Sequence, residues 1–208
     1  MSKFASRVVS RMLRTRTGII SGGQPRILNV DRGVSFYGYA EVNTQATSPV
    51  ARVKQHKAWF IGGASVQDGD LIQDRGDGKY YLVMSLKDEL DGGEVAYIDG
   101  TLYYANATCS IQRFGTAGKN AFGRQSTDAP VTIKDGVYIM VNPLSMDVVD
   151  HDDRSIPNDK TKIVIQAREN VQRNDRLVTS LGDTFIVEDI DRSSINNLWV
   201  LKVNQDSR

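Results

Sequence analysis

The sequence predicts a mainly β protein: two small antiparallel β-barrel or β-sandwich domains preceded by a short N-terminal amphipathic helix. Short runs of aromatic and β-branched residues, separated by glycine turns, recur from Arg26 onward. Helical periodicity of useful length is confined to the N-terminal stretch. A segment rich in glycine and small polar residues, 115–130, divides the β-type runs into two blocks, which we interpret as two domains.

Residues 1–17 are predicted to form a basic helix or arm. Ser2 can cap a helix over residues 2–16, and apolar residues recur on one face at spacings of three to five: Phe4, Val8, Met12 and Leu13. The arginines lie mainly elsewhere, and the candidates for partner contact are Arg7, Arg11 and Arg14. Two alternatives stay open, because the apolar face can pack on its own domain or dock on a neighbouring subunit.

The first β-rich domain is expected over residues 18–114. Its candidate strands lie in the stretches RILNV, VSFYGYAEV, VARVKQ, KAWFIG, DLIQD, KYYLVMSL, EVAYIDG, TLYYAN and ATCSIQRF. Asp77-Gly78 is typical of a hairpin turn, which explains the Arg75-Gly76-Asp77 sequence better than receptor binding does.

The second β-rich domain is expected over residues 131–208, after the linker or projecting loop at 115–130. Its candidate strands are VTIKDGVYIMV, TKIVIQA, DRLVTS, DTFIVEDI and LWVLKVN. The two blocks share one order: strand, glycine turn, strand, loop, strand. This order starts at Asp70 in the first block and at Asp175 in the second. A duplicated barrel and two unrelated antiparallel meanders both fit this punctuation.

Composition limits the classes of function. A chain of 208 residues, 40% hydrophobic and 25% charged, is typical of globular domains. The net charge of +1 gives no global field that would attract nucleic acid or a membrane, so such contacts would need local patches. With one cysteine, Cys109, the chain can form neither an internal disulfide nor a cysteine-based zinc site. No segment has the apolar length of a membrane span, and arginines interrupt the N-terminus, so neither membrane insertion nor secretion is expected.

The last quarter of the chain resembles the head-completion or stopper proteins of tailed phages, also called head–tail joining proteins. The residues that carry the resemblance are Ile163-Val164-Ile165, Asp175-Arg176-Leu177, Gly182-Asp183, Phe185-Ile186-Val187 and Leu198-Trp199-Val200-Leu201. The first block is similar to domains of phage neck and minor head proteins through Gly69–Ile72, Lys79–Val83 and Leu102–Asn106. The extra β domain and the basic helix depart from the small stopper pattern, which leaves the position in the neck open.

The resemblance implies a structural virion protein that is made in the cytoplasm of a bacterial host. It implies a homo-oligomeric ring between a portal or adaptor protein and a tail or terminator protein, around a DNA channel. Such a ring has no cofactor and no catalytic residues, and it can touch DNA without sequence preference. Lys119 and Arg124 of the glycine-rich segment are the candidates for contact with the lumen or the next ring.

Chemical sites are weakly indicated. The one cluster with plausible metal ligands is acidic, with a single histidine: Asp147, Asp150, His151, Asp152 and Asp153. Its surroundings are typical of a solvated loop, so no bound metal is expected. Gly115–Asn120 lacks the glycine and the Ser or Thr that a phosphate-binding loop needs at Arg113 and Asn120. His56 lies in a predicted strand and is interpreted as structural.

Alternative functions come from two classes. Another tail component, such as an adaptor, a tail terminator or a baseplate hub, would share the same architecture. A carbohydrate- or receptor-binding β module would need an exposed stacking platform, for which Trp59, Tyr80 and Tyr81 are the candidates. A small hydrolase using the acidic loop is the weakest alternative, because no local nucleophile signature is present.

Overall fold

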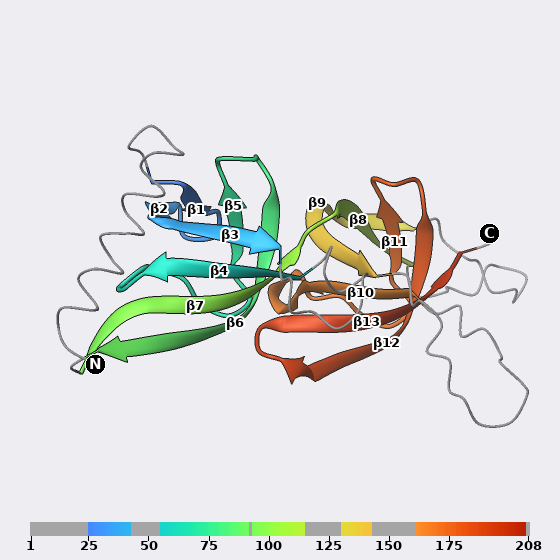
Figure 1. Cartoon of the computed structure of the whole chain (residues 1–208). Coiled ribbons are helices and arrows are strands. Elements are labelled where there is room, and N and C mark those ends of the chain that lie inside the picture. Colours follow the sequence, from blue (N-terminus) through green and yellow to red (C-terminus); the bar gives the residue numbers. More distant parts are fainter. Residues whose placement is uncertain (1–24, 43–54, 92, 115–129, 143–160, 207–208) are drawn as a thin grey trace, which may run out of the picture. The chain divides into compact units, whose positions relative to one another are not determined.

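The computed structural model of the chain describes residues 25–42, 55–91, 93–114, 130–142 and 161–206 (Figure 1). The described residues are mainly β, as the sequence predicts, while the predicted helix at 2–16 lies outside them. They form two compact units. Unit 1 comprises the described residues up to Ala105 together with Ile195–Leu198, and unit 2 comprises those from Asn106 to Ser194 and from Trp199 onward.

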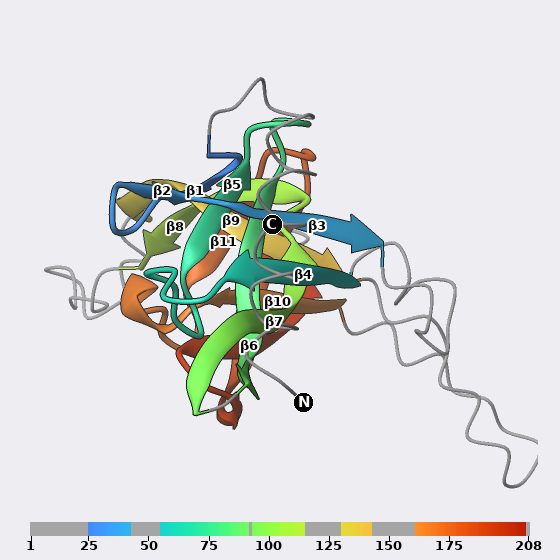
Figure 2. The same ribbon diagram turned by 60° about the vertical axis from the view of Figure 1, so that its left-hand side comes forward.

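Unit 1 is a seven-stranded antiparallel sheet with the strand order β2-β1-β5-β6-β7-β4-β3. Its strands are β1 (Ile27–Asn29), β2 (Val34–Phe36), β3 (Gly38–Val42), β4 (Gln55–Ile61), β5 (Leu71–Asp74), β6 (Tyr80–Asp91) and β7 (Glu94–Tyr104). Figure 2 shows β3, β4 and β7 side by side, and their register is continuous along β4. The stretches EVAYIDG and TLYYAN, expected as two strands, form the single strand β7.

The two edges of this sheet are consecutive in the chain, because only Tyr37 separates β2 from β3. The sheet therefore curls until its edges meet at this residue. The Ile61 amide donates to the Tyr37 carbonyl at 3.0 Å, which holds the end of β4 against the joint. Gly38 begins β3 at a crowded point, where a Cβ atom would lie 2.7 Å from the Phe60 ring. A residue without a side chain is required for the close approach.

Alternation along β4 explains which face is buried. His56, Ala58 and Phe60 point into the unit, with at most 7% of each exposed, while the residues between them face outward. The core of unit 1 consists of Ile27, Phe36, Ala58, Phe60, Val66, Ile72, Tyr81, Val83, Ile98 and Leu102.

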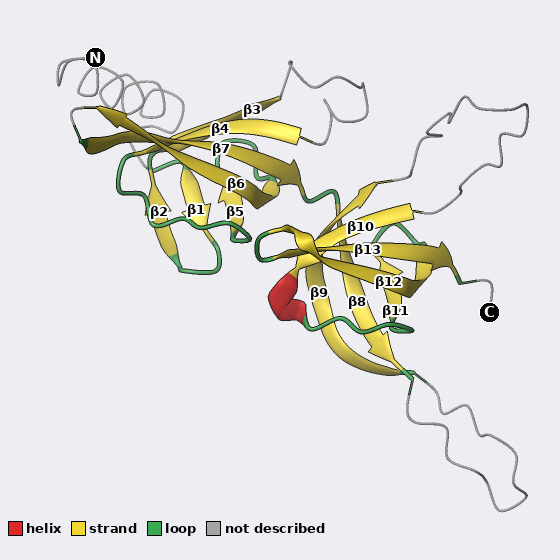
Figure 3. Ribbon diagram, turned by 90° about the horizontal axis from the view of Figure 1, so that it is seen from below, coloured by secondary structure: helices red, strands yellow, loops and turns green. Residues whose placement is uncertain are grey.

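Unit 2 is a closed barrel with the strand order β10-β13-β12-β11-β8-β9. Its strands are β8 (Ala107–Arg113), β9 (Val131–Asn142), β10 (Thr161–Gln166), β11 (Arg176–Thr179), β12 (Thr184–Ile195) and β13 (Leu198–Gln205). A short 3-10 helix, η1 (Ala167–Glu169), follows β10 (Figure 3). The barrel interior is filled with aliphatic residues, Phe185 and Cys109, so it is a packed core and not a channel.

The boundary between the units corrects the predicted domain limits. It lies between Ala105 and Asn106, so β8, expected in the first domain, is a strand of the second barrel. The strands β8 and β9 pair as neighbours, Arg113 with Val131, across the glycine-rich segment 115–130. This segment therefore connects two strands within unit 2 and is not a linker between domains. Glycine and small polar residues are common in both kinds of connection, so composition cannot distinguish them.

Both units have the same strand connectivity. Starting from β9, the order in unit 2 is β9-β8-β11-β12-β13-β10, which closes back on β9. In unit 1 the order β2-β1-β5-β6-β7-β4-β3 is the same if β2 and β3 together correspond to the long strand β9. Each unit is thus a copy of one six-element plan in the same chain order, with β1 matching β8, β4 matching β10, and β5 to β7 matching β11 to β13.

The residue registers match as well. Ile72 pairs with Tyr81 in unit 1, and Leu177 pairs with Phe185 in unit 2. The end of the last strand is fixed identically, because the Ala105 amide donates to the carbonyl of Tyr80 at 2.9 Å and the Asp206 amide donates to that of Thr184 at 2.8 Å. Of the two alternatives left open by the sequence, the structure favours a repeated unit over unrelated meanders, although only unit 2 is a closed barrel.

Candidate functional site

The most closely repeated feature of the two units is the turn that precedes β5 and β11. Its sequence is Val66-Gln67-Asp68-Gly69-Asp70 in unit 1 and Val171-Gln172-Arg173-Asn174-Asp175 in unit 2. The fourth position has a positive φ in both turns, 86° at Gly69 and 67° at Asn174. Glycine and asparagine are the residues that adopt this left-handed conformation most readily. In both turns the valine is buried in the core and the final aspartate is buried beneath the sheet.

In unit 1, Asp70 ties three segments together through one carboxylate oxygen. Its Oδ2 accepts from the Gln67 amide at 2.9 Å, from Asn29 Nδ2 at 2.7 Å and from Arg32 Nε at 2.9 Å. The hydrogen bond to Asp70 raises the pKa of the Arg32 guanidinium.

In unit 2, Asp175 makes the corresponding contacts with a bidentate arginine. Its Oδ2 accepts from the Gln172 amide at 2.7 Å, and its two oxygens accept from Arg113 Nε and Nη2, both at 2.8 Å. Arg113 Nη2 also donates to the Asn170 carbonyl at 3.1 Å. Since Asp175 is 1% exposed, this carboxylate is a structural anchor and not a group that meets substrate.

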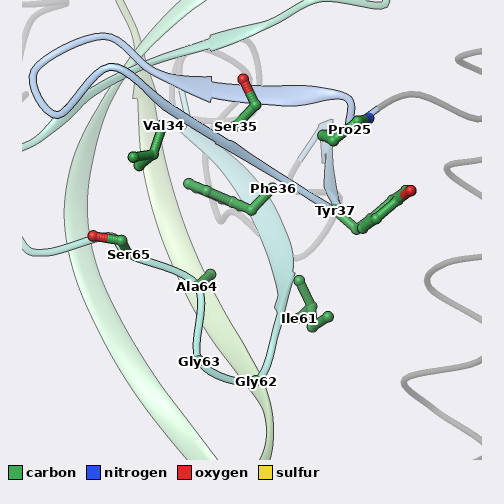
Figure 4. Close-up of a pocket in the computed structure, with 10 residues that line it drawn as sticks. All are labelled: Pro25, Val34, Ser35, Phe36, Tyr37, Ile61, Gly62, Gly63, Ala64 and Ser65. Atoms are coloured by element: carbon green, nitrogen blue, oxygen red, sulfur yellow. The ribbon is translucent and has the colours of Figure 1, made fainter.

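Unit 1 contains an open hollow of about 370 Å³ beside β2, lined by uncharged residues that are partly polar and partly apolar (Figure 4). Val34, Phe36, Ile61 and Ala64 line it together with Gly62-Gly63, and none of its ten lining residues is charged. Val66 and Val171 occupy the same position in the two units. Counting back from these valines, the segment that contains η1 and Asn170, Ala167-Arg168-Glu169-Asn170, corresponds to Gly62-Gly63-Ala64-Ser65 of unit 1.

The strand register assigns Val34 to the position of Lys134. Ile72 and Leu177 are equivalent positions of the two units. Ile72 pairs with Asn29, which pairs on its other side with Val34. Leu177 pairs with Ile111, which pairs on its other side with Lys134. In unit 2, Lys134 Nζ lies 2.6 Å from Glu169 Oε2, and only 3% of the Glu169 side chain is exposed. Valine and alanine stand at the two equivalent positions of unit 1, so unit 1 has no such ion pair there.

The cysteine and the histidine of the described residues are both buried. Cys109 is 2% exposed, and burial, reinforced by Glu169 and Asp135, raises the pKa of its thiol to about 12. His56 is 7% exposed and lies edge-on to the Tyr81 ring at 5.0 Å, as expected for a structural histidine. Among the described residues no group of three or more His, Cys, Asp or Glu is arranged to hold a metal ion.

Comparison of the chain with protein-family models, curated proteins and solved structures gave no match.

The candidate contact and metal residues predicted from the sequence lie outside the described parts of the chain. They are Arg7, Arg11 and Arg14, then Lys119 and Arg124, then Asp147, Asp150, His151, Asp152 and Asp153. The structure therefore leaves the predicted DNA-lumen contacts and the weak metal cluster as predictions. Within the described residues, no helix is long and apolar enough to cross a membrane.

The three aromatic residues predicted as a stacking platform do not all lie on one face of unit 1. Tyr81 is 2% exposed and belongs to the core of unit 1, whereas Trp59 lies on the opposite face of the sheet and stacks on Tyr39 at 5.0 Å. Burial also raises the pKa of the Tyr81 phenol well above its usual value. Alternation along β6 directs Tyr80 and Tyr81 to opposite sides of the strand, so these two rings do not share one surface.

Sequence reasoning missed the hollow and the aspartate turns. The Val-Gln dipeptides at 66–67 and 171–172, each followed three residues later by aspartate, were a visible signal. Aligning the two blocks on them would have paired Gly-Gly-Ala-Ser with Ala-Arg-Glu-Asn. That alignment places Ala64 at the position of Glu169, so unit 1 has no carboxylate there to form an ion pair.

Proposed function

We propose that this chain is a structural virion protein that forms a homo-oligomeric ring in the neck of a tailed phage. In this role it joins the portal or adaptor side of the head to the tail or its terminator, and it helps to retain or pass the genome. It acts by binding and not by turnover. Lys119 and Arg124 face the channel or the next ring, and the basic segment 1–17 attaches the ring to a neighbour.

The observation that carries the proposal is the closed barrel of unit 2. The residues that resemble the stopper proteins form its frame: Ile163–Ile165 lie on β10, Phe185–Val187 on β12 and Leu198–Leu201 on β13. Asp175, from the acidic-basic-apolar triplet of that pattern, is the anchor held by Arg113. The resemblance therefore involves barrel positions that lie together in space, which supports a structural role for the whole segment.

The chemistry of the described residues also supports an assembly role. The buried carboxylates Asp70 and Asp175 are engaged by arginines, and the single thiol is buried in a barrel core. Large apolar side chains remain exposed on the strands and turns of both units, among them Leu90, Val131, Ile133 and Leu181, at 51% to 66%. In the proposed ring, contacts with neighbouring chains would bury such side chains.

The direct test is the assembly state of the purified full chain. Light scattering coupled to size exclusion, followed by negative-stain electron microscopy, should give a multiple of the 23.1 kDa chain mass and closed rings with a central opening. In the phage that encodes the chain, disrupting the gene should give separate heads and tails, and adding the purified protein should join them. A chain that stays monomeric at tens of micromolar and leaves joining unchanged would contradict the proposal.

A second test concerns the basic N-terminal segment. Deleting residues 2–16 should leave the thermal unfolding of both units unchanged, because the strands that the structure describes all lie after Pro25. Ring formation or attachment to the head should be lost. A truncated chain that completes infectious particles at normal yield would show that this segment has no role in docking.

A further inference from the structure

The two units have equivalent open hollows, each between the aspartate turn (66–70 or 171–175) and strand β6 or β12. In unit 1 the Gly69 amide of the turn donates to the Val83 carbonyl of β6 at 2.7 Å. In unit 2 the Asn174 amide donates to the Val187 carbonyl of β12 at 2.8 Å. Val83 and Val187 are therefore equivalent, and counting onward from them aligns β6 with β12.

Equivalent positions around the two hollows carry opposite charge. The unit 1 hollow, of about 460 Å³, has Asp68 in the turn and Asp88 five residues after the shared valine. The unit 2 hollow, of about 340 Å³, has Arg173 and Arg192 at these positions. We call them the acidic hollow and the arginine hollow. Reversing both charges changes the partner that each site accepts.

Both arginines of the arginine hollow present their charge to the surface. Arg192 is exposed and lies over the Trp199 ring, 4.8 Å from its centroid, which orients the guanidinium group. The Arg173 side chain is 70% exposed and lies 2.5 Å from Asp189. Because an exposed ion pair contributes little stability, Arg173 can turn to another carboxylate at small cost.

The arginine hollow also includes a carboxylate, Asp191, which is engaged within its own strand. Its Oδ1 accepts from the amides of Ser193 and Ser194 at 2.9 and 3.1 Å, and both hydroxyl groups donate to it as well. The five residues that line this hollow therefore carry two positive charges and one internally bonded negative charge.

One side of the acidic hollow is formed by a hairpin turn. Ile195–Leu198, where β12 passes into β13, belong to unit 1, and Asn196 and Asn197 line the hollow. Asn197 Nδ2 donates to the Asp68 carbonyl at 2.9 Å. The structure thus contains an example of what fits this site: a two-residue β-turn, here with uncharged amide donors facing the aspartates.

The equivalent hairpin turn of unit 1 has the charge that suits the arginine hollow. Strands β6 and β7 are joined at residues 92–93, and Asp91 pairs with Glu94 across the turn. The stretch 87–94 contains four acidic residues and one lysine. Glu94 and Val95 are exposed, and among the described residues the arginine hollow is lined only by its own turn and β12.

The small residue has changed sides together with the charge. At the acidic hollow, a Cβ atom on Gly69 would lie 2.4 Å from Asn197 Cβ, so the turn can approach only because that residue is glycine. At the arginine hollow the same position is Asn174, but the hairpin residue equivalent to Asn197 is Gly93. Both hairpin residues have a positive φ, 57° and 90°. Each pairing therefore has glycine on one side.

We propose that the acidic β6–β7 turn of one copy binds the arginine hollow of a second copy, in the way that the β12–β13 turn lies in the acidic hollow. The inference rests on the ring proposed above and names a contact that builds it. Each copy has one such turn and one such hollow, so the contact is heterologous and can repeat around a closed ring. As an electrostatic contact at the surface, it weakens with added salt.

The test reverses the charge on each side of the contact. The hollow variant is Arg173→Glu with Arg192→Glu, and the turn variant is Asp91→Lys with Glu94→Lys. Each should fold like the wild type, because the changed residues lie at the surface or beside a turn, and each should associate at least roughly tenfold more weakly. The control is Arg75→Glu with Lys79→Glu in the exposed β5–β6 turn, which should assemble normally.

Mixing the two variants separates this contact from a general effect of charge. The hollow variant has two acidic sides and the turn variant two basic sides, so neither self-associates, but each complements the other. A 1:1 mixture should therefore recover assembly in analytical ultracentrifugation, and so should one chain that carries all four substitutions.

The outcomes distinguish this contact from the ring itself. Variants that assemble like the wild type, or a mixture that stays monomeric, would overturn the turn-and-hollow contact and leave the ring proposal standing. A hollow variant that assembles normally but loses affinity for double-stranded DNA would assign the arginines to phosphate groups and also overturn the contact. A wild-type chain that is monomeric at every concentration would overturn the ring proposal and this contact with it.

Discussion

Replacing Asp175 with asparagine should destabilise unit 2 selectively. The carboxylate is 1% exposed and accepts two hydrogen bonds from Arg113 and one from the Gln172 amide, all between 2.7 and 2.8 Å. Asparagine keeps the shape of the side chain, but it removes the charge and turns one acceptor into a donor that faces the arginine. The Arg113 side chain is 29% exposed and can recover part of its hydration. The expected loss in the free energy of unfolding is about 3 kcal/mol, at the lower end for a broken buried ion pair.

The two tryptophans allow each unit to be followed separately. Trp59 belongs to unit 1 and Trp199 to unit 2, so a Trp59→Phe background reports unit 2 and a Trp199→Phe background reports unit 1. With a urea m value of about 1.5–2 kcal/mol/M, the midpoint of the Trp199 transition should fall by roughly 1.5–2 M in Asp175→Asn. The Trp59 transition should stay where it is.

The matched control is Asp189→Asn, which breaks an ion pair to Arg173 in the same unit. Both of its side chains are well exposed, 40% and 70%, so no measurable change in the midpoint is expected. A shift below about 0.5 M in Asp175→Asn, or an equal shift in the control, would refute the reasoning that the buried anchor holds the turn to the barrel.

Three further predictions concern single residues. Cys109 should be inert to a thiol reagent at pH 8 in the folded chain and react at once in urea, because burial raises its pKa to about 12; fast labelling of the native chain would contradict this. Gly38→Ala should lower the stability of unit 1 by about 1–3 kcal/mol, since the new methyl would meet the Phe60 ring and a backbone oxygen, and an unchanged Trp59 transition would show that the joint can yield. Hydrogen bonding from Ser194 lowers the pKa of Asp191 to about 2, so its contribution is present above the unfolded value near 4 and is lost as the pH falls through about 2. Asp191→Asn should reduce the drop in the unit 2 midpoint between pH 5 and pH 2; an identical drop in the variant would exclude Asp191 as a source.

The fold could be predicted from the sequence where alternation and turn residues act locally. The stretches DLIQD and DTFIVEDI gave β5 and β12 because β-branched and aromatic residues flank glycine turns with positive φ, at Gly78 and Gly182. The Asp77-Gly78 turn prediction is likewise confirmed, since the Gly78 amide donates to the Asp74 carbonyl at 2.8 Å.

Non-local pairing is where sequence reasoning failed. Nothing in ATCSIQRF distinguishes a last strand of one domain from the first strand of the next, because its partner β9 lies beyond the glycine-rich segment. The same limit hid the hollow: Val34 and Ala64 are unremarkable residues in sequence, and their meaning appears only when the register places them opposite the Lys134–Glu169 pair.

The position of the last strand in each repeat has a consequence during synthesis. In unit 1, β7 lies between β6 and β4, and in unit 2, β13 lies between β12 and β10. The strand made last therefore inserts between two strands made earlier, so neither sheet can close while the ribosome is still adding residues to it. Until then β4 and β10 each lack one of their two neighbours, and both are open to pairing with another nascent chain. Polysomes that carry several growing copies would bring such edges together, and slow elongation through the stretches before β7 and β13 would lengthen the exposure.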